Sequence, residues 1–147
     1  MENKNSDITI SGNALLELIP QREPMVMINT LSRSESEFFT TLTVKSDNLF
    51  CENGHLSECG LAENMAQSAA AREGFICHAK GKEIPLGMIG AIEKARFFRL
   101  PLSSETITTY IEPVEEIFNI VLLSAVVKAG EEVVAEGKLK IYLKGKE

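Results

Sequence analysis

The sequence has no tryptophan, only two tyrosines and two histidines among its 147 residues, and no long hydrophobic run. No apolar stretch approaches the roughly 20 residues of a membrane-spanning helix, so we expect no membrane segment. The first ten residues, MENKNSDITI, lack the apolar core of a signal peptide. The three cysteines are an odd number, which favours reduced thiols in a cytoplasm over a disulfide framework.

Positive charge is also scarce. Fifteen Lys and Arg stand against 21 Asp and Glu, for a net charge of −6, which argues against a nucleic-acid partner. Hydrophobic residues make up 44% and charged residues 24%, a globular rather than a disordered balance. With no repeat and no Pro/Gly/Ser-rich linker, the length predicts a single domain over residues 1–147, frayed over residues 1–12.

The hydrophobic pattern predicts one long helix among strands. A helix is expected over 61–73, ended by Gly74, after one or two helical turns over 13–19 and a stiff turn from Pro20 to Pro24. Strands are expected over 25–31, 37–45, 87–98, 106–112, 118–128 and 132–143. Turn signals between the late strands are Ser103-Ser104, Pro113 and residues 129–131. This is an α+β pattern whose late strands, joined by short connections, should be antiparallel.

The predicted helix has an unusual composition. Residues 61–71 read LAENMAQSAAA, with five alanines and a single charge, Glu63. A helix on the surface would present a charged face, so we expect this one to lie inside the curl of the sheet. Glu63 would then have little water around it, which favours the protonated carboxyl that a general acid needs.

His55 and Glu63 are the main candidates for chemistry. His55 lies just before the helix and Glu63 follows it by eight positions, so the two could flank one substrate carbon. Gly54 would let backbone approach a ligand, and N–H groups at the helix start could stabilise an oxyanion. The structural alternative is that His55 is an ordinary loop residue and Glu63 favours the positive end of the helix dipole. Spacing by itself leaves both interpretations open.

Two further groups of residues carry side chains that could bind a metal ion or a charged partner. Cys51, His55 and Cys59, with Cys77-His78, are zinc-ligand types, but the tight Cys-x2–4-Cys pair of common zinc sites is missing, so we expect no metal. Lys94, Arg96 and Arg99 form a basic stretch in an acidic chain, and on a regular strand Lys94 and Arg96 would share one face. The stretch could dock a phosphate-bearing or acidic partner, or simply protect a sheet edge.

Four segments resemble the 3-hydroxyacyl-acyl carrier protein dehydratases of the hotdog fold. They cover most of the chain in unbroken order and read LIPQREPMVMIN at 18–29, NGHL at 53–56, ENMAQSAA at 63–70 and KARFFRLP at 94–101. The second segment is similar to the family's Gly-His-Phe-Pro and the third to its Glu-Ala-Leu-Ala-Gln-Ala-Ala helix. The short connection between His55 and Glu63 further resembles the divergent dehydratase-like proteins of aryl-polyene and related pigment pathways.

The resemblance implies a hotdog fold, in which a curved antiparallel sheet wraps around the central helix. It also implies reversible loss of water from a 3-hydroxyacyl thioester to give a trans-2-enoyl thioester, in fatty acid or polyene-type lipid synthesis. His55 would be the base and Glu63 the acid, with Gly60 or Gly54 supplying an oxyanion N–H. Gln67 lies one helical turn beyond Glu63, so by spacing it could hold that carboxyl through a hydrogen bond or could simply face solvent. Apolar residues of the first strand and the helix would line an acyl tunnel.

The same resemblance implies partners. The substrate would arrive on the phosphopantetheine arm of acyl carrier protein, with no other cofactor and no metal, and Lys94, Arg96 and Arg99 would receive the carrier. Two hotdog subunits, identical or different, would pair edge to edge, with higher oligomers open, and share sites between His55 of one chain and Glu63 of the other. Two alternatives remain: a hotdog thioesterase using Glu63, and a non-catalytic subunit that completes a partner's site.

Overall fold

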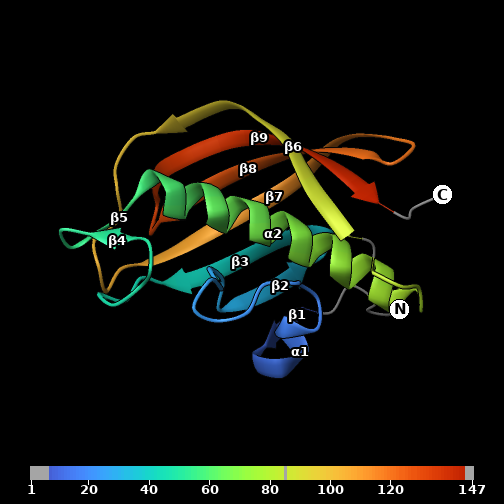
Figure 1. The fold of residues 1–147 in the computed structure, drawn as a ribbon, viewed down its shortest axis with the longest axis horizontal. Coiled ribbons are helices and arrows are strands. Elements are labelled where there is room, and N and C mark those ends of the chain that lie inside the picture. The colour runs from blue at the N-terminus through green and yellow to red at the C-terminus, as the bar shows by residue number, and fades with distance from the viewer. Residues whose placement is uncertain (1–6, 85, 145–147) are drawn as a thin grey trace.

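The computed structural model describes residues 7–84 and 86–144. A seven-stranded sheet curves around one long helix, α2, which crosses its concave face (Figure 1). The strand order is β1-β2-β3-β7-β8-β9-β6, and every neighbouring pair is antiparallel, which confirms the prediction for the late strands β7, β8 and β9 with their short connections. The strands of this sheet are β1 (Ile8–Ser11), β2 (Thr30–Ser34), β3 (Glu37–Thr43), β6 (Leu86–Phe97), β7 (Thr106–Ile117), β8 (Ile120–Ala129) and β9 (Glu132–Lys144).

The central helix is longer than its apolar pattern predicted. Helix α2 spans Glu58–Ala79, and Gly74 lies within it rather than ending it. A side chain at Gly74 would collide with the backbone oxygen of Leu18, so this glycine is needed for packing. The helix instead ends at Ala79. Gly81, just past the C-cap Lys80, has a φ of 70° in the left-handed region, and Lys82 N–H bonds to Cys77 O at 2.9 Å. This 6→1 bond is typical of a Schellman motif.

The N-terminal third differs from the prediction in two places. Residues 8–11 form β1, paired with β2, and are followed by α1 (Gly12–Leu16), so this part of the expected frayed start is ordered. Residues 25–29, predicted as the start of a strand, run alongside α2 before β2 begins at Thr30. Met27 N–H donates to Gln67 Oε1 at 2.7 Å, so a helix side chain takes the place of a neighbouring strand. An apolar run does not indicate whether its backbone hydrogen bonds will be made to a neighbouring strand or to a polar side chain.

The β7–β8 hairpin is longer than expected. Pro113 was predicted to end the strand, but β7 continues to Ile117, with a register shift between Pro113 and Glu115. A bulge accommodates proline because one residue there need not donate to the ladder. The chain turns instead at Phe118, which has a φ of 54°. The predicted turns at Ser103-Ser104 and at Gly130 are confirmed.

The hydrophobic core lies between α2 and the concave face of the sheet. Residues that face the helix alternate along the strands, as in β8, where Val121, Leu123, Ala125 and Val127 are all buried. A smaller cluster joins Leu15, Leu18 and Ile19 to the second half of the helix. The expected position of the helix inside the curl is therefore confirmed. Among the described residues, no helix is long and apolar enough to cross a membrane.

Candidate active site

His55 sits on a small hairpin just before α2. Strands β4 (Cys51–Glu52) and β5 (His55–Leu56) pair through a two-residue turn, and both turn residues, Asn53 and Gly54, have positive φ of 53° and 78°. Asn-Gly is the sequence best suited to this turn, which matches the twist of the strands. Gly54 therefore serves the turn; it is exposed, and its carbonyl accepts the N–H of Ser103 at 2.9 Å.

The imidazole of His55 is held in one tautomer. Its Nδ1 lies 2.9 Å from the carbonyl oxygen of Asn53. Because a carbonyl can only accept, Nδ1 is the nitrogen that carries the hydrogen, and in the neutral ring Nε2 then keeps its lone pair. His55 is half-buried and lines an open cavity of about 1030 Å³ together with Ser57, Glu58 and Cys59 at the start of α2. A free Nε2 beside a helix N-terminus is an arrangement that can remove a proton and stabilise the resulting negative charge.

The N–H groups at the helix start are not those expected from the sequence. Gly60 N–H donates to Oγ of Ser57, the N-cap residue, at 3.2 Å, so Gly60 is not a free oxyanion donor. Gly60 is instead a packing position, where a Cβ would lie 2.6 Å from Leu56 Cδ1. Within the described part of the chain, the N–H groups of Glu58 and Cys59 have no acceptor, as the first turn of a helix leaves them.

Glu63 lies farther along α2 and is half-buried. Its Oε2 accepts a hydrogen bond of 2.8 Å from Nε2 of Gln67, as the one-turn spacing predicted. Gln67 is fully buried, and its amide is fixed on both sides: Nε2 also donates to Met25 O at 2.7 Å, and Oε1 accepts from Met27 N–H. The orientation of the Glu63 carboxyl is therefore coupled to the segment that precedes β2.

Sequence reasoning missed a second buried polar set on the same helix. Asn64 Nδ2 donates to Met27 O at 2.8 Å, and its Oδ1 accepts from Thr109 Oγ1 at 2.5 Å. Ser68 donates to Asn64 O at 2.7 Å, and its Oγ lies 2.6 Å from Thr40 Oγ1. The signal was present, since polar residues on an alanine-rich buried helix need partners, but their partners lie on strands distant in sequence.

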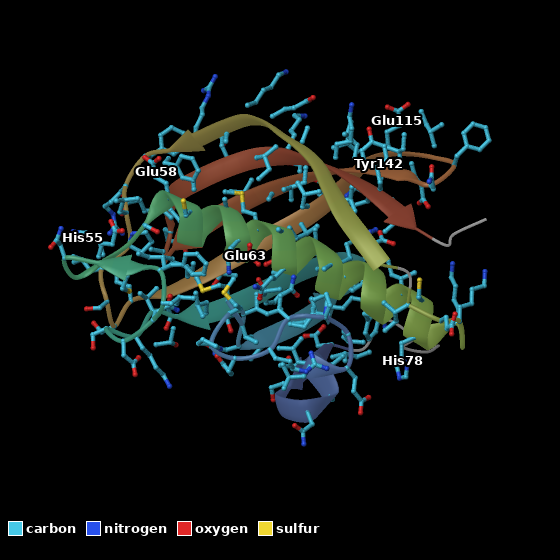
Figure 2. All side chains as sticks on the ribbon, viewed as in Figure 1. His55, Glu58, Glu63, His78, Glu115 and Tyr142 are labelled. Carbon is cyan, nitrogen blue, oxygen red and sulfur yellow. The ribbon has the colours of Figure 1, made fainter. Side chains whose placement is uncertain are left out.

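One chain does not bring His55 and Glu63 together. In Figure 2, His55 lies on the small hairpin at one end of the molecule, whereas Glu63 lies on α2 itself, in the second turn of that helix. Glu63 is not among the residues that line the His55 cavity. Within one chain, as far as the structure describes it, the two side chains therefore do not line a common cavity.

A separate apolar cleft of about 300 Å³ opens beside α2. Ala66, Ala70 and Glu73 form its helix wall, and the small side chains of the two alanines, one and two turns beyond Glu63, leave the space open. The remaining lining is largely aliphatic, from Leu18, Ile19, Ile84, Ile89, Ile141 and Leu143. The acyl tunnel was predicted to be lined by apolar residues of the helix and of the first strand. Helix residues do line this cleft, whereas Met27 and Ile28 of the predicted first strand are buried in the core.

The basic stretch is less regular than a plain strand. A register shift between Glu93 and Arg96, with Lys94 at a φ of 54°, interrupts the alternation that would have put Lys94 and Arg96 on one face. Both side chains are exposed. Arg99 is different, because it pairs with Glu105 at 2.9 Å and with Glu132 at 3.1 Å.

The carboxylate of Glu105 is held ionised by these contacts. The hydrogen bonds from Arg99 and from Leu102 N–H lower the pKa of Glu105, and the two carboxylates raise the pKa of Arg99. The Arg99 guanidinium is thus engaged by two carboxylates of its own chain.

The cysteines and histidines do not gather. Cys77 and His78 lie in the last turns of α2, at the opposite end from Cys51 and His55 (Figure 2). Within residues 7–84 and 86–144, no three His, Cys, Asp or Glu side chains are grouped closely enough to hold a metal ion. Burial, helped by Asp47, raises the pKa of Cys51 and keeps its thiol protonated.

Comparison with known proteins agrees with these features. The family model described as ApeP-like, ApeP dehydratase, matches residues 13–146. The chain belongs to this family. The resemblance to hotdog dehydratases is therefore confirmed, and the chain is a dehydratase. No curated protein matches the chain in sequence.

Solved structures share the fold of this ApeP-like chain. The dehydratase heterocomplex ApeI:P from Xenorhabdus doucetiae is similar with a TM-score of 0.81 at 19% identity, over 90% of this chain and 91% of that one. The PaaI protein of Escherichia coli has a TM-score of 0.60 at 15% identity, over 78% of both chains. A hypothetical thioesterase from Streptococcus pneumoniae, solved with coenzyme A, has a TM-score of 0.59 at 12% identity, covering 76% and 80%. The hotdog fold is confirmed.

Proposed function

We propose that this dehydratase removes water from a 3-hydroxyacyl thioester carried on the phosphopantetheine arm of acyl carrier protein, giving a trans-2-enoyl thioester for fatty acid or polyene-type lipid synthesis. The observation that carries the proposal is the tautomer of His55, whose bond to Asn53 O leaves Nε2 as a base in a cavity bordered by the start of α2. The family match supplies the reaction class.

The reaction needs two proton transfers. His55 Nε2 takes a proton from the carbon beside the thioester carbonyl, and the electron pair forms an enolate-like transition state. The N–H groups of Glu58 and Cys59 stabilise the oxygen of that enolate. Glu63, oriented by Gln67, donates a proton to the departing hydroxyl, and the carbon–oxygen bond breaks to release water. Atoms and charge balance without electron transfer, so this scheme uses no separate cofactor.

The acyl group would occupy the cleft beside Ala66 and Ala70. This cleft begins one helical turn beyond Glu63, which is where a chain attached to the reacting carbon would extend. Its aliphatic lining suits a hydrocarbon substituent.

A second hotdog chain would complete the site. The separation of His55 from Glu63 within one chain supports this, as does the strand β6, which lies at the edge of the sheet with Ile89 and Ile92 exposed. The similar Xenorhabdus doucetiae protein belongs to a heterocomplex, so we propose that the second chain is either a copy of this one or a different hotdog subunit.

Lys94 and Arg96, which stay exposed on β6, are proposed to receive the acidic carrier. The three cysteines are free thiols, which suits the cytoplasmic location that we propose.

Mass spectrometry of a 3-hydroxyacyl-carrier thioester incubated with the protein tests this function. We expect the acyl group to lose the mass of one water, and His55→Ala and Glu63→Gln each to abolish that loss. The matched control is His78→Ala, which removes the other histidine from the exposed far end of α2 and should leave turnover unchanged. Release of free acid would instead establish the thioesterase alternative. A third outcome is that the substrate stays unchanged until a different hotdog chain is added. If His55→Ala then leaves the restored turnover unaffected, the non-catalytic alternative is established.

A further inference from the structure

The hairpin that carries His55 is short and depends on a neighbouring segment. Each of its strands has two residues, and a two-stranded hairpin alone is marginally stable in water. Leu56 anchors its base in the core. Its outer side is paired by residues 101–103: Leu56 N–H donates to Pro101 O at 2.8 Å, and His55 forms an antiparallel bridge with Leu102. Residues 101–103 therefore act as a third strand beside the histidine.

That third strand is itself held by an ion pair. Glu105 Oε1 accepts the N–H of Leu102 at 2.8 Å and Arg99 Nη1 at 2.9 Å, while Oε2 accepts Arg99 Nη2 at 3.2 Å. The fork of the guanidinium fixes the plane of the carboxylate, which aims Oε1 at the Leu102 N–H. A continuous series of contacts thus runs from Arg99 through Glu105 and Leu102 to His55.

Arg99 also connects this series to the main sheet. Its Nε lies 3.2 Å from both carboxylate oxygens of Glu132, the first residue of β9. The hairpin has few contacts of its own, whereas β9 lies between β8 and β6 in the seven-stranded sheet. The Arg99 guanidinium therefore anchors the turn beside His55 to the main sheet.

We propose that Arg99 and Glu105 are positioning residues that hold His55 in its working place and tautomer. This rests on the proposed function, which makes His55 the base. Arg99 then serves the chemical step, and the carrier-docking charges are Lys94 and Arg96 alone. A base displaced by a fraction of an ångström from the reacting carbon loses much of its effect, so the contacts that fix the hairpin set the rate.

Steady-state kinetics on two substrates separates positioning from docking. The same 3-hydroxyacyl group is presented on acyl carrier protein and on a short pantetheine thioester that lacks the carrier. Arg99→Lys keeps the charge but loses the fork, and Glu105→Ala removes the acceptor of Leu102 N–H. We expect each variant to lower kcat by about ten- to a hundredfold on both substrates with little change in KM. The matched control, Glu131→Gln, removes the neighbouring exposed carboxylate, which is not one of the two carboxylates paired with Arg99, and should change kcat by less than about threefold.

Nitrogen NMR of the imidazole rings gives a readout that does not depend on turnover. The chain has two histidines, so His78 serves as the internal reference. We expect the Nδ1–H form of His55 to lose its dominance in Glu105→Ala, with His78 unchanged and the circular dichroism spectrum intact. Glu105→Gln, which retains an oxygen acceptor, should recover part of both kcat and the tautomer preference.

Two results would overturn the proposal. If Arg99→Lys and Glu105→Ala keep wild-type kcat on the pantetheine thioester, or lose activity only through KM on the carrier, Arg99 docks the carrier instead. If the His55 signals are the same in every folded variant, the ion pair does not position the ring. Failure of the proposed function looks different: His55→Ala would stay active while the NMR signals still changed.

Discussion

Gln67 holds the Glu63 carboxyl group and the Met27 N–H with the two ends of one buried amide, at 2.8 Å and 2.7 Å. The side chain is fully buried, so neither contact can be replaced by water. The amide cannot rotate without losing a partner on each side, which fixes the direction of the Glu63 carboxyl.

Gln67→Leu should lower the free energy of unfolding by roughly 1–3 kcal/mol, because it leaves the buried Met27 N–H without an acceptor. Urea unfolding followed by circular dichroism measures the change. Gln21→Leu is the matched control: Oε1 of Gln21 is buried with no partner among the described residues, so its removal should cost little. Equal losses in the two variants would contradict the role given to Gln67.

Gly74→Ala should destabilise the protein even though alanine favours helices more than glycine does by about 1 kcal/mol. The new methyl group would collide with the backbone oxygen of Leu18, which belongs to a buried segment and cannot move freely. Thermal unfolding should show a lower Tm, with a net loss of about 1–3 kcal/mol. His78→Ala, on the exposed part of the same helix, should change stability by less than about 0.5 kcal/mol.

Mixing two inactive variants tests whether the site is shared between chains. A mixed dimer of His55→Ala and Glu63→Gln chains would contain one site with both changes and one site with neither. If the chain acts as a homodimer, random pairing should restore about a quarter of wild-type turnover, since half of the dimers have one working site of two. No recovery from folded, exchanged dimers would show that identical chains do not share these two residues.

The Arg99–Glu105 contact should make stability depend on pH in a defined direction. The hydrogen bonds from Arg99 and Leu102 lower the pKa of Glu105 below its ordinary value of 4.5. Its stabilising contribution is therefore complete above that value and is lost as the pH falls through the lowered pKa of the folded state. Wild type should be more stable than Glu105→Gln near neutral pH, and the difference should vanish in stronger acid. A constant difference across this range would contradict the assignment.

Thiol reagents should distinguish the cysteines. Cys59 is exposed, whereas Cys51 is half-buried, donates to Lys45 O at 3.2 Å and has a raised pKa through burial and Asp47. The thiolate of Cys51 is thus scarce at neutral pH, and its labelling should accelerate only at high pH. Mass mapping after brief treatment with iodoacetamide should find Cys59 modified first. Faster labelling of Cys51 would contradict the packing of this loop.

The local pattern of the sequence was sufficient for most of the fold. Alternation predicted the strand Glu37–Thr43, and the alanine-rich stretch after Leu61 predicted a helix enclosed by the sheet. Side-chain spacing also predicted the Glu63–Gln67 contact, because residues four apart on a helix are neighbours whatever surrounds them. The motif around His55 and Glu63 identified the dehydratase family from the residues themselves.

Tertiary contacts decided the rest. A glycine is needed at position 74, within the helix, because Leu18 leaves no room for a side chain there. Met27 is not part of the sheet because its N–H donates to the side chain of Gln67 instead of to a neighbouring strand. Arg99 looked like a free docking charge until the fold placed Glu132, more than thirty residues later, beside it. In each case the deciding partner is distant in sequence. The periodicity of a sequence indicates which face of a helix or strand is buried. It does not indicate which residue packs against that face, because that partner is set only when distant parts of the chain come together.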